Sequence, residues 1–277
     1  MGMRINTNVS SIAARRALGK NNQNLNDNLR KLSSGKRITR ASDDAAGLAI
    51  SEKLKAEIRG TRQAKRNAGD SIALIQTAEG GLNEISSILI RLRELAIQAS
   101  SDTVGEPERK FGDMEFQQLK EEVDRIAKSS SFNGIKLLDG TGGVLDFQVG
   151  TRNDPVLDRV SFDFTGADGT LAYLGIGSEA ISSKMGAQQS LDKLDNAMVQ
   201  VNGARANMGA IQNRLNSVIN NLAYTDENLS AAKSRIRDVD IAEETAELAK
   251  NSILVQSGVS VLSQTNNAPN VALKLIG

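Results

Sequence analysis

Two neighbouring carboxylates, Asp43 and Asp44, have the residue type and spacing that could hold a divalent cation or share acid and base roles. The 277-residue chain contains no histidine and no cysteine, which removes the commonest base, the thiol nucleophile and the usual zinc ligands. Ser42 precedes the two acids at the expected start of a helix, so we interpret Ser42 as its N-cap and the acids as first-turn charges. The pattern predicts a protein that is not an enzyme, with no catalytic residue, metal site or cofactor.

A second candidate for binding chemistry is the glycine-rich stretch from Gly175 to Ala180, which superficially fits a dinucleotide fingerprint. That fingerprint works only inside a parallel strand–helix–strand unit, and no such unit is indicated on either side of it. We therefore predict an ordinary loop.

Charge is distributed unevenly, although the formal net charge is only +1. Residues 1–40 carry nine Lys or Arg and one acid, whereas residues 238–249 carry five acids and no base. A basic arm can attract nucleic acid, but this arm has no aromatic side chain on which bases could stack. We predict that the two oppositely charged chain ends pair with each other and that nucleic acid is not a partner.

The apolar residues are those of long packed helices. Aromatic residues make up 3 % of the chain and tryptophan is absent, so the apolar surface consists of Ala, Leu, Ile and Val. No stretch is apolar enough to predict membrane insertion, and the first residues lack the apolar core of a secretory signal.

The stretch from Ser42 to Ala99 must position most other elements, because it predicts one helix roughly 85 Å long. Its apolar residues recur in steps of three and four, with Glu79 the only polar occupant of the row: Ile72, Ile75, Leu82, Ile85, Leu89, Leu92, Ala96 and Ala99. A second seam of this kind runs from Leu191 to Leu222, interrupted by Arg205 and Gln212. We expect these two helices to pack together.

Shorter elements fill the remainder. Pro107 predicts the start of a helix that reaches about Lys128, with an apolar seam of Phe111, Met114, Leu119, Val123 and Ile126. Alternating apolar residues then predict a β-hairpin at about 144–165. Thin seams predict a helix at each chain end, the first ending at Gly35, the last following a break at 226–228 and ending near Pro269. The predicted fold is mainly α, with long antiparallel helices in a coiled-coil-like bundle, one small β-hairpin and paired terminal helices.

With this outline, several motifs in order resemble those of bacterial flagellins over essentially the whole chain. They are Ile5-Asn6-Thr7-Asn8, Leu32-Ser33-Ser34-Gly35, Asp43 to Ile50, Gln63-Ala64-Lys65-Arg66-Asn67, Gln76-Thr77-Ala78-Glu79-Gly80, Arg91 to Gln98, Phe132-Asn133-Gly134 and Asn267 to Val271. The resemblance implies a short member that lacks the large outer domains, and a structural subunit that polymerises into the filament used for swimming. The alternative is a hook–filament junction protein of the same superfamily.

The resemblance also implies an organisation. The inner domain would comprise the arms 1–41 and 226–277, and the central helical domain would comprise 42–185 and 186–225. Inner-domain assembly would depend on Ile5, Val9, Ile12, Leu25, Leu29, Leu32, Ile241, Leu248, Val255 and Leu262. Subunit contact on the outer helices, and recognition by Toll-like receptor 5, would depend on Arg91, Leu95 and Glu115.

Partners and location follow from the same resemblance. The expected partners are other copies of the chain in a helical filament, hook-junction and cap proteins, and an export chaperone on the C-terminal arm. Export would use the flagellar type III channel without a cleaved signal peptide, and the filament would be extracellular. We expect the weakly apolar arms to be disordered in the monomer and to fold on docking, which would restrict growth to the filament tip.

Overall fold

The computed structural model describes the backbone of residues 7–273 and the side chains of residues 7–267. The elements are α1 (Val9–Ser34), α2 (Ala45–Ser100), α3 (Glu106–Ser129), β1 (Ser131–Phe132), β2 (Ile135–Lys136), β3 (Val144–Gln148), β4 (Arg159–Asp163), the 3-10 turn η1 (Thr165–Ala167), α4 (Leu171–Leu174), α5 (Lys184–Arg237) and α6 (Ile241–Leu273). They form two compact units. We call the described residues up to Ile58 and from Asn228 the terminal unit, and Arg59–Glu227 the central unit.

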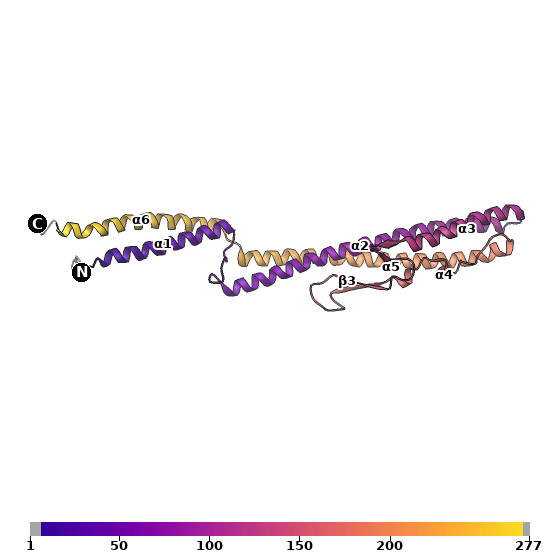
Figure 1. The fold of residues 1–277 in the computed structure, drawn as a ribbon, viewed down its shortest axis with the longest axis horizontal. Helices are drawn as coiled ribbons and strands as arrows, with labels where there is room; N and C mark the ends of the chain where they lie inside the picture. The colour runs from indigo at the N-terminus through magenta and orange to yellow at the C-terminus, as the bar shows by residue number, and fades with distance from the viewer. Residues whose placement is uncertain (1–6, 274–277) are drawn as a thin grey trace. The chain divides into compact units, whose positions relative to one another are not determined.

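The central unit contains the main apolar core, to which α2, α3, α5 and the β3–β4 hairpin contribute (Figure 1). The apolar row predicted for α2 faces this core, and its members from Ile75 to Ala99 are buried. The seam of α5 faces it as well, with Leu194, Val201, Met208 and Leu215 buried. The mainly α fold and the packing of the two long helices are therefore confirmed.

The seam predicted for α3 is partly wrong. Phe111 and Met114 are 69 % and 60 % exposed, whereas Phe116, Lys120 and Val123 are buried. The predicted Val123 is buried and the predicted Leu119 and Ile126 pack against the core, but Phe116 and Lys120 take the places expected for Phe111 and Met114. Lys120 donates from Nζ to the carbonyls of Gly177 and Glu179, at 2.9 and 2.8 Å, and so satisfies its charge inside the fold.

The β-hairpin lies where the alternating residues predicted it. β3 and β4 are antiparallel, with Leu145 opposite Phe162 and Phe147 opposite Val160. A further antiparallel pair, β1 and β2, surrounds the turn at Asn133 and Gly134. Both turn residues have positive φ, 50° and 83°, which is the backbone conformation that an Asn-Gly turn supplies.

The terminal unit pairs α1 with α6 in antiparallel orientation, as the charge pattern predicted (Figure 1). Gly35 ends α1 in the left-handed conformation, φ 65°, as expected. The connectors that follow α1 and precede α6 also meet. Arg37 N donates to the Arg237 carbonyl at 2.7 Å, and Val239 N donates to the Gly35 carbonyl at 3.2 Å.

Three predicted helix boundaries are wrong. α5 does not break at 226–228: Asp226 lies within it and pairs with Arg62 at 2.9 Å. The break comes at Asp238–Asp240, where Asp240 caps α6 by accepting from Ala242 N at 2.8 Å. At the other end, α6 continues through Pro269 to Leu273, since one proline removes a single helical hydrogen bond without always ending a helix. The third concerns the start of α2, described below.

Candidate functional site

The paired acids Asp43 and Asp44 bind backbone groups rather than forming an open carboxylate pair. Asp43 Oδ2 accepts from Thr39 N and Arg40 N, both at 2.9 Å, and Asp44 Oδ1 accepts from Gly47 N at 2.8 Å. The N-cap of α2 is therefore Asp44, and the expectation that Ser42 caps this helix is wrong. A carboxylate that accepts two or three such bonds is stabilised in its charged form. The pKa of Asp43 is accordingly lowered to about 2, chiefly by the backbone donors of Arg40 and Thr39.

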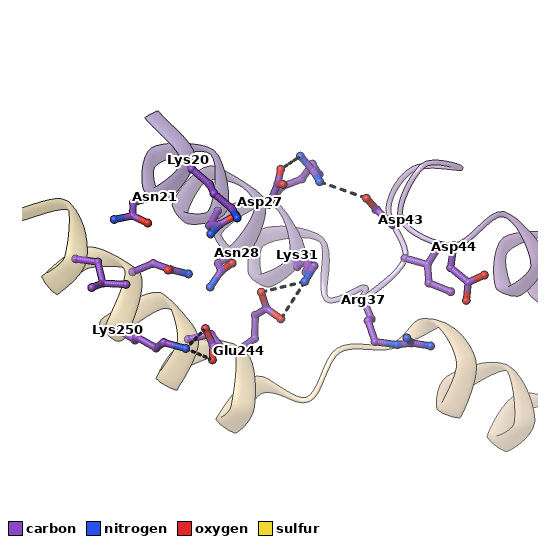
Figure 2. Close-up of a pocket in the computed structure, with 16 residues that line it drawn as sticks. Lys20, Asn21, Asp27, Asn28, Lys31, Arg37, Asp43, Asp44, Glu244 and Lys250 are labelled. Atoms are coloured by element: carbon purple, nitrogen blue, oxygen red, sulfur yellow. Dashed lines mark hydrogen bonds and ion pairs between the residues drawn. The ribbon is translucent and has the colours of Figure 1, made fainter. Parts of the chain in front are cut away.

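A cleft of about 800 Å³ lies beside these acids (Figure 2). It is lined by residues of α1, of the connector between α1 and α2, and of α6. Its charges are largely paired within the cleft. Lys31 lies 3.4 Å from Glu244, and Lys250 lies 3.0 Å from Glu247. Among the described residues, no group of three or more acids is placed to hold a metal ion. The cleft is a polar junction between two helices.

The glycine-rich stretch is a helix end and a loop, as predicted. Gly175 ends the short helix α4 with φ 68°, and no parallel strand is present among the described residues. Within the same part of the chain, no helix is both long and apolar enough to cross a membrane.

The structure divides the predicted inner-arm residues into two sets. One set lies half-buried between α1 and α6: Leu25, Leu32, Leu248, Val255 and Leu262. The other set points to solvent: Val9, Ile12, Leu29 and Ile241 are 49–60 % exposed. Ile5 lies outside the described residues.

Sequence reasoning missed further exposed apolar residues on α6, namely Ile253, Leu254, Val259 and Val261. They fall between the heptad positions that identified Leu248, Val255 and Leu262. The high share of branched apolar residues in this segment was the available signal. These side chains lie on more than one face of α6, and a single neighbouring helix covers only one face, so their apolar character is unexplained within a single chain.

The three predicted outer-helix residues come together at a groove of about 300 Å³ between α2 and α3, which we call the outer groove. Arg91 donates to Glu115 Oε1 from Nε at 3.0 Å and from Nη2 at 2.9 Å, and these bonds raise the pKa of Arg91. Leu95 lines the groove but is only 5 % exposed, so it also belongs to the core. The exposed ring of Phe111 lies on the same groove.

The loop between β3 and β4 is a further feature, which the sequence did not predict. Val156 and Leu157 are 76 % and 80 % exposed on it. Asp154 Oδ1 accepts from both of their backbone N–H groups, at 2.8 and 3.0 Å, and Asp154 N donates to Asp158 Oδ2 at 3.0 Å. The loop therefore holds two branched apolar side chains outward on a hydrogen-bonded frame, which is typical of a contact surface.

Comparison with known proteins gives matches at both ends of the chain. Residues 5–142 match the model of the bacterial flagellin N-terminal helical region, and residues 191–276 match that of the bacterial flagellin C-terminal helical region. Together the two matched regions include α1, α2, α3, most of α5 and all of α6.

Individual relatives agree with these matches. A flagellin of Halalkalibacterium halodurans is 44 % identical over 99 % of this chain and 100 % of its own length. A flagellin of Bacillus subtilis is 42 % identical, with the same shares covered. Among solved structures, a Bacillus cereus flagellin aligns with a TM-score of 0.51 at 32 % identity, over 61 % of this chain and 94 % of the other.

Proposed function

The chain belongs to the bacterial flagellin family and is a structural subunit of the extracellular flagellar filament, and we propose that its terminal unit drives polymerisation. The exposed apolar side chains of α1 and α6 support this proposal. Side chains such as Ile12 and Val259, each at least half exposed, would be removed from water in the filament by another copy. Stacking terminal units would therefore supply burial that the single chain lacks.

The domain boundaries belong to the same proposal. Residues 1–41 and 226–277 form the inner domain, and residues 42–185 and 186–225 form the central helical domain. The described α1–α6 pairing supports an inner domain built from the two chain ends. Helix α5 continues through 226–228, so this boundary would lie inside a helix rather than at a loop.

The central unit carries two different candidate contact surfaces, the outer groove and the β3–β4 loop. Contacts between unlike surfaces generate an open helix when the rotation from one copy to the next does not close a ring, and one contact type can then repeat without limit. We assign subunit contact at the outer groove to Arg91, Leu95 and Glu115.

The same three residues are the proposed recognition site for Toll-like receptor 5. A receptor-reporter cell assay with the monomer tests this, and absence of signal would contradict it.

Further partners are proposed from family membership alone. They are hook-junction and cap proteins at the filament ends and an export chaperone on the C-terminal arm. Export would be through the type III channel without a cleaved signal peptide. Because members of the family are structural proteins, no catalytic role is assigned.

The variant Leu248→Asp tests the role of the terminal unit. Leu248 is half-buried between α6 and α1, so an aspartate there should weaken the arm without touching the central core. We expect loss of seeded filaments in electron micrographs while most of the helical circular dichroism remains. Ser252→Asp, at an exposed polar position of α6, is the matched control and should polymerise. Normal filaments from Leu248→Asp would contradict the proposal, and long filaments from the purified chain alone would exclude a junction role.

A further inference from the structure

The side chains that α1 and α6 bury most completely are polar. Among their described residues, Ser11, Asn28, Glu244 and Asn251 are 6–9 % exposed, and no leucine, isoleucine or valine of either helix reaches that burial. Even when they are hydrogen-bonded, buried polar groups often stabilise a helix pair less than apolar side chains of similar size would, but they can specify one alignment of the two helices.

The apolar residues of the seam cannot by themselves define how the two helices align. Leu18, Leu25 and Leu32 recur every seven residues on α1, and Leu248, Val255 and Leu262 recur every seven residues on α6. Sliding one helix past the other by seven residues would return the apolar positions of both helices to equivalent places along the seam. The free energy gained from apolar burial would change little.

Polar contacts at one end of the pair fit a single alignment. Ser11 Oγ donates to Asn266 Oδ1 at 2.7 Å, and Asn8 Nδ2 donates to the carbonyl of Thr265 at 2.7 Å. A slip of seven residues in either direction would move Ser11 seven residues away from Asn266 and Asn8 seven residues away from Thr265. Both contacts would then be lost.

Polar contacts at the other end fit the same alignment (Figure 2). Lys31 on α1 lies 3.4 Å from the buried carboxylate of Glu244 on α6. With its amide oriented as its neighbours require, Asn28 donates to the Asn24 carbonyl at 2.7 Å and accepts from Asn251 Nδ2 at 3.3 Å. A seven-residue slip in either direction separates Lys31 from Glu244 and leaves that carboxylate without its cation.

We propose that these polar pairs are specificity-determining residues for assembly, because they select one register of the α1–α6 pair. The proposal rests on the proposed role of the terminal unit in polymerisation. An open helical filament requires every copy to present the same surface. A slipped pair would present its exposed apolar side chains in displaced positions, and the next copy would meet a surface that does not fit.

The absence of cysteine from the chain allows a direct test by disulfide trapping. A Cβ on Gly258 would lie 3.2 Å from Leu18 Cδ1, so Leu18→Cys with Gly258→Cys reports the observed register. Leu25→Cys with Gly258→Cys reports a slip of seven residues in the direction that moves Lys31 from Glu244 towards Asn251. Each pair is introduced separately, copolymerised with excess unaltered chain so that filaments form, and oxidised. Intramolecular disulfide is then measured on non-reducing gels.

The perturbation is Lys31→Glu, which places two carboxylates together, and the control is the charge-exchanged double variant Lys31→Glu with Glu244→Lys. In the parent chain we expect only the disulfide that reports the observed register. In Lys31→Glu the ratio of slipped-register to observed-register disulfide should rise about tenfold. In the double variant this ratio should return to that of the parent chain. An unchanged ratio in Lys31→Glu, or no recovery in the double variant, would overturn the proposal. The backbone contacts between the connectors would then set the register. Polymerisation of the unaltered chain is scored separately, and its failure would count against the proposed function instead.

Discussion

Arg205 on α5 binds Glu79 on α2, with Nε and Nη2 at 3.1 and 2.8 Å from the same carboxylate oxygen. Glu79 is the one polar residue in the apolar row of α2, and Arg205 is one of two polar positions in the seam of α5. The polar interruptions of the two seams therefore meet each other. An ion pair at such a position favours one alignment of two long helices whose apolar residues recur at similar spacing.

The energetic value of this pair should be modest. The side chains of Arg205 and Glu79 are 31 % and 35 % exposed, so water screens their attraction. A double-mutant cycle with Glu79→Ala and Arg205→Ala, measured by urea unfolding, should give a coupling free energy of about 0.5–1 kcal/mol. A coupling above about 3 kcal/mol would show that the pair acts as a buried one.

Stability of the central unit should depend on the buried row of α2. Ile85 is 0 % exposed, and replacing it by alanine should lower the free energy of unfolding by about 3 kcal/mol through lost burial and the cavity left behind. Ile90, on the same helix, is 52 % exposed, so Ile90→Ala should change stability by less than about 0.5 kcal/mol. Equal effects of the two substitutions would contradict the assignment of the core face.

Much of this fold could be predicted from periodicity. The seams of α2 and α5, the alternating strands and the glycine that ends α1 are repeated or strongly local signals, and all lie where predicted. The buried face of α3 could not be predicted in full, because Lys120 occupies it. Its charge is satisfied by carbonyls more than fifty residues away, a contact invisible in the local sequence.

The helix ends could be predicted less well from the sequence than the buried faces. The path of the preceding connector decides which of Ser42, Asp43 and Asp44 caps α2. Asp43 does not cap it, because its carboxylate accepts hydrogen bonds from Thr39 N and Arg40 N. The exposed pair Val156 and Leu157 carries no periodic signal at all. It could be recognised only once the loop hydrogen bonds showed that the structure holds these side chains outward.

The β3–β4 loop should matter for polymerisation and little for folding. Leu157→Ser removes an 80 % exposed side chain and should leave the free energy of unfolding within about 0.5 kcal/mol. If another copy buries this leucine, its loss should slow seeded filament growth about tenfold, because such burial is worth roughly 1.5 kcal/mol or more. Turbidity and electron microscopy would measure growth. Unaltered growth of the variant would remove this loop from the assembly surfaces.

Acid should weaken the connector between α1 and α2 through Asp43. Its pKa is about 2 in the folded chain, below the ordinary 3.8, so its contribution to stability is complete above pH 4. That contribution is lost as the pH falls from about 4 to about 2, where the folded carboxylate takes up a proton. The difference in thermal midpoint between the parent chain and Asp43→Asn should therefore be larger at pH 5 than at pH 2. Asp70→Asn, an exposed position of α2, controls for the loss of one carboxylate.

The account depends most on terminal helices that gain their order through contact with other copies. Hydrogen exchange measured by mass spectrometry on dilute monomer and on filaments compares these helices directly with the central unit. We predict rapid exchange across 9–34 and 241–267 in the monomer, strong protection of both segments in the filament, and protection of 70–99 in both states. Full protection of both terminal segments in a strictly monomeric sample would contradict the account.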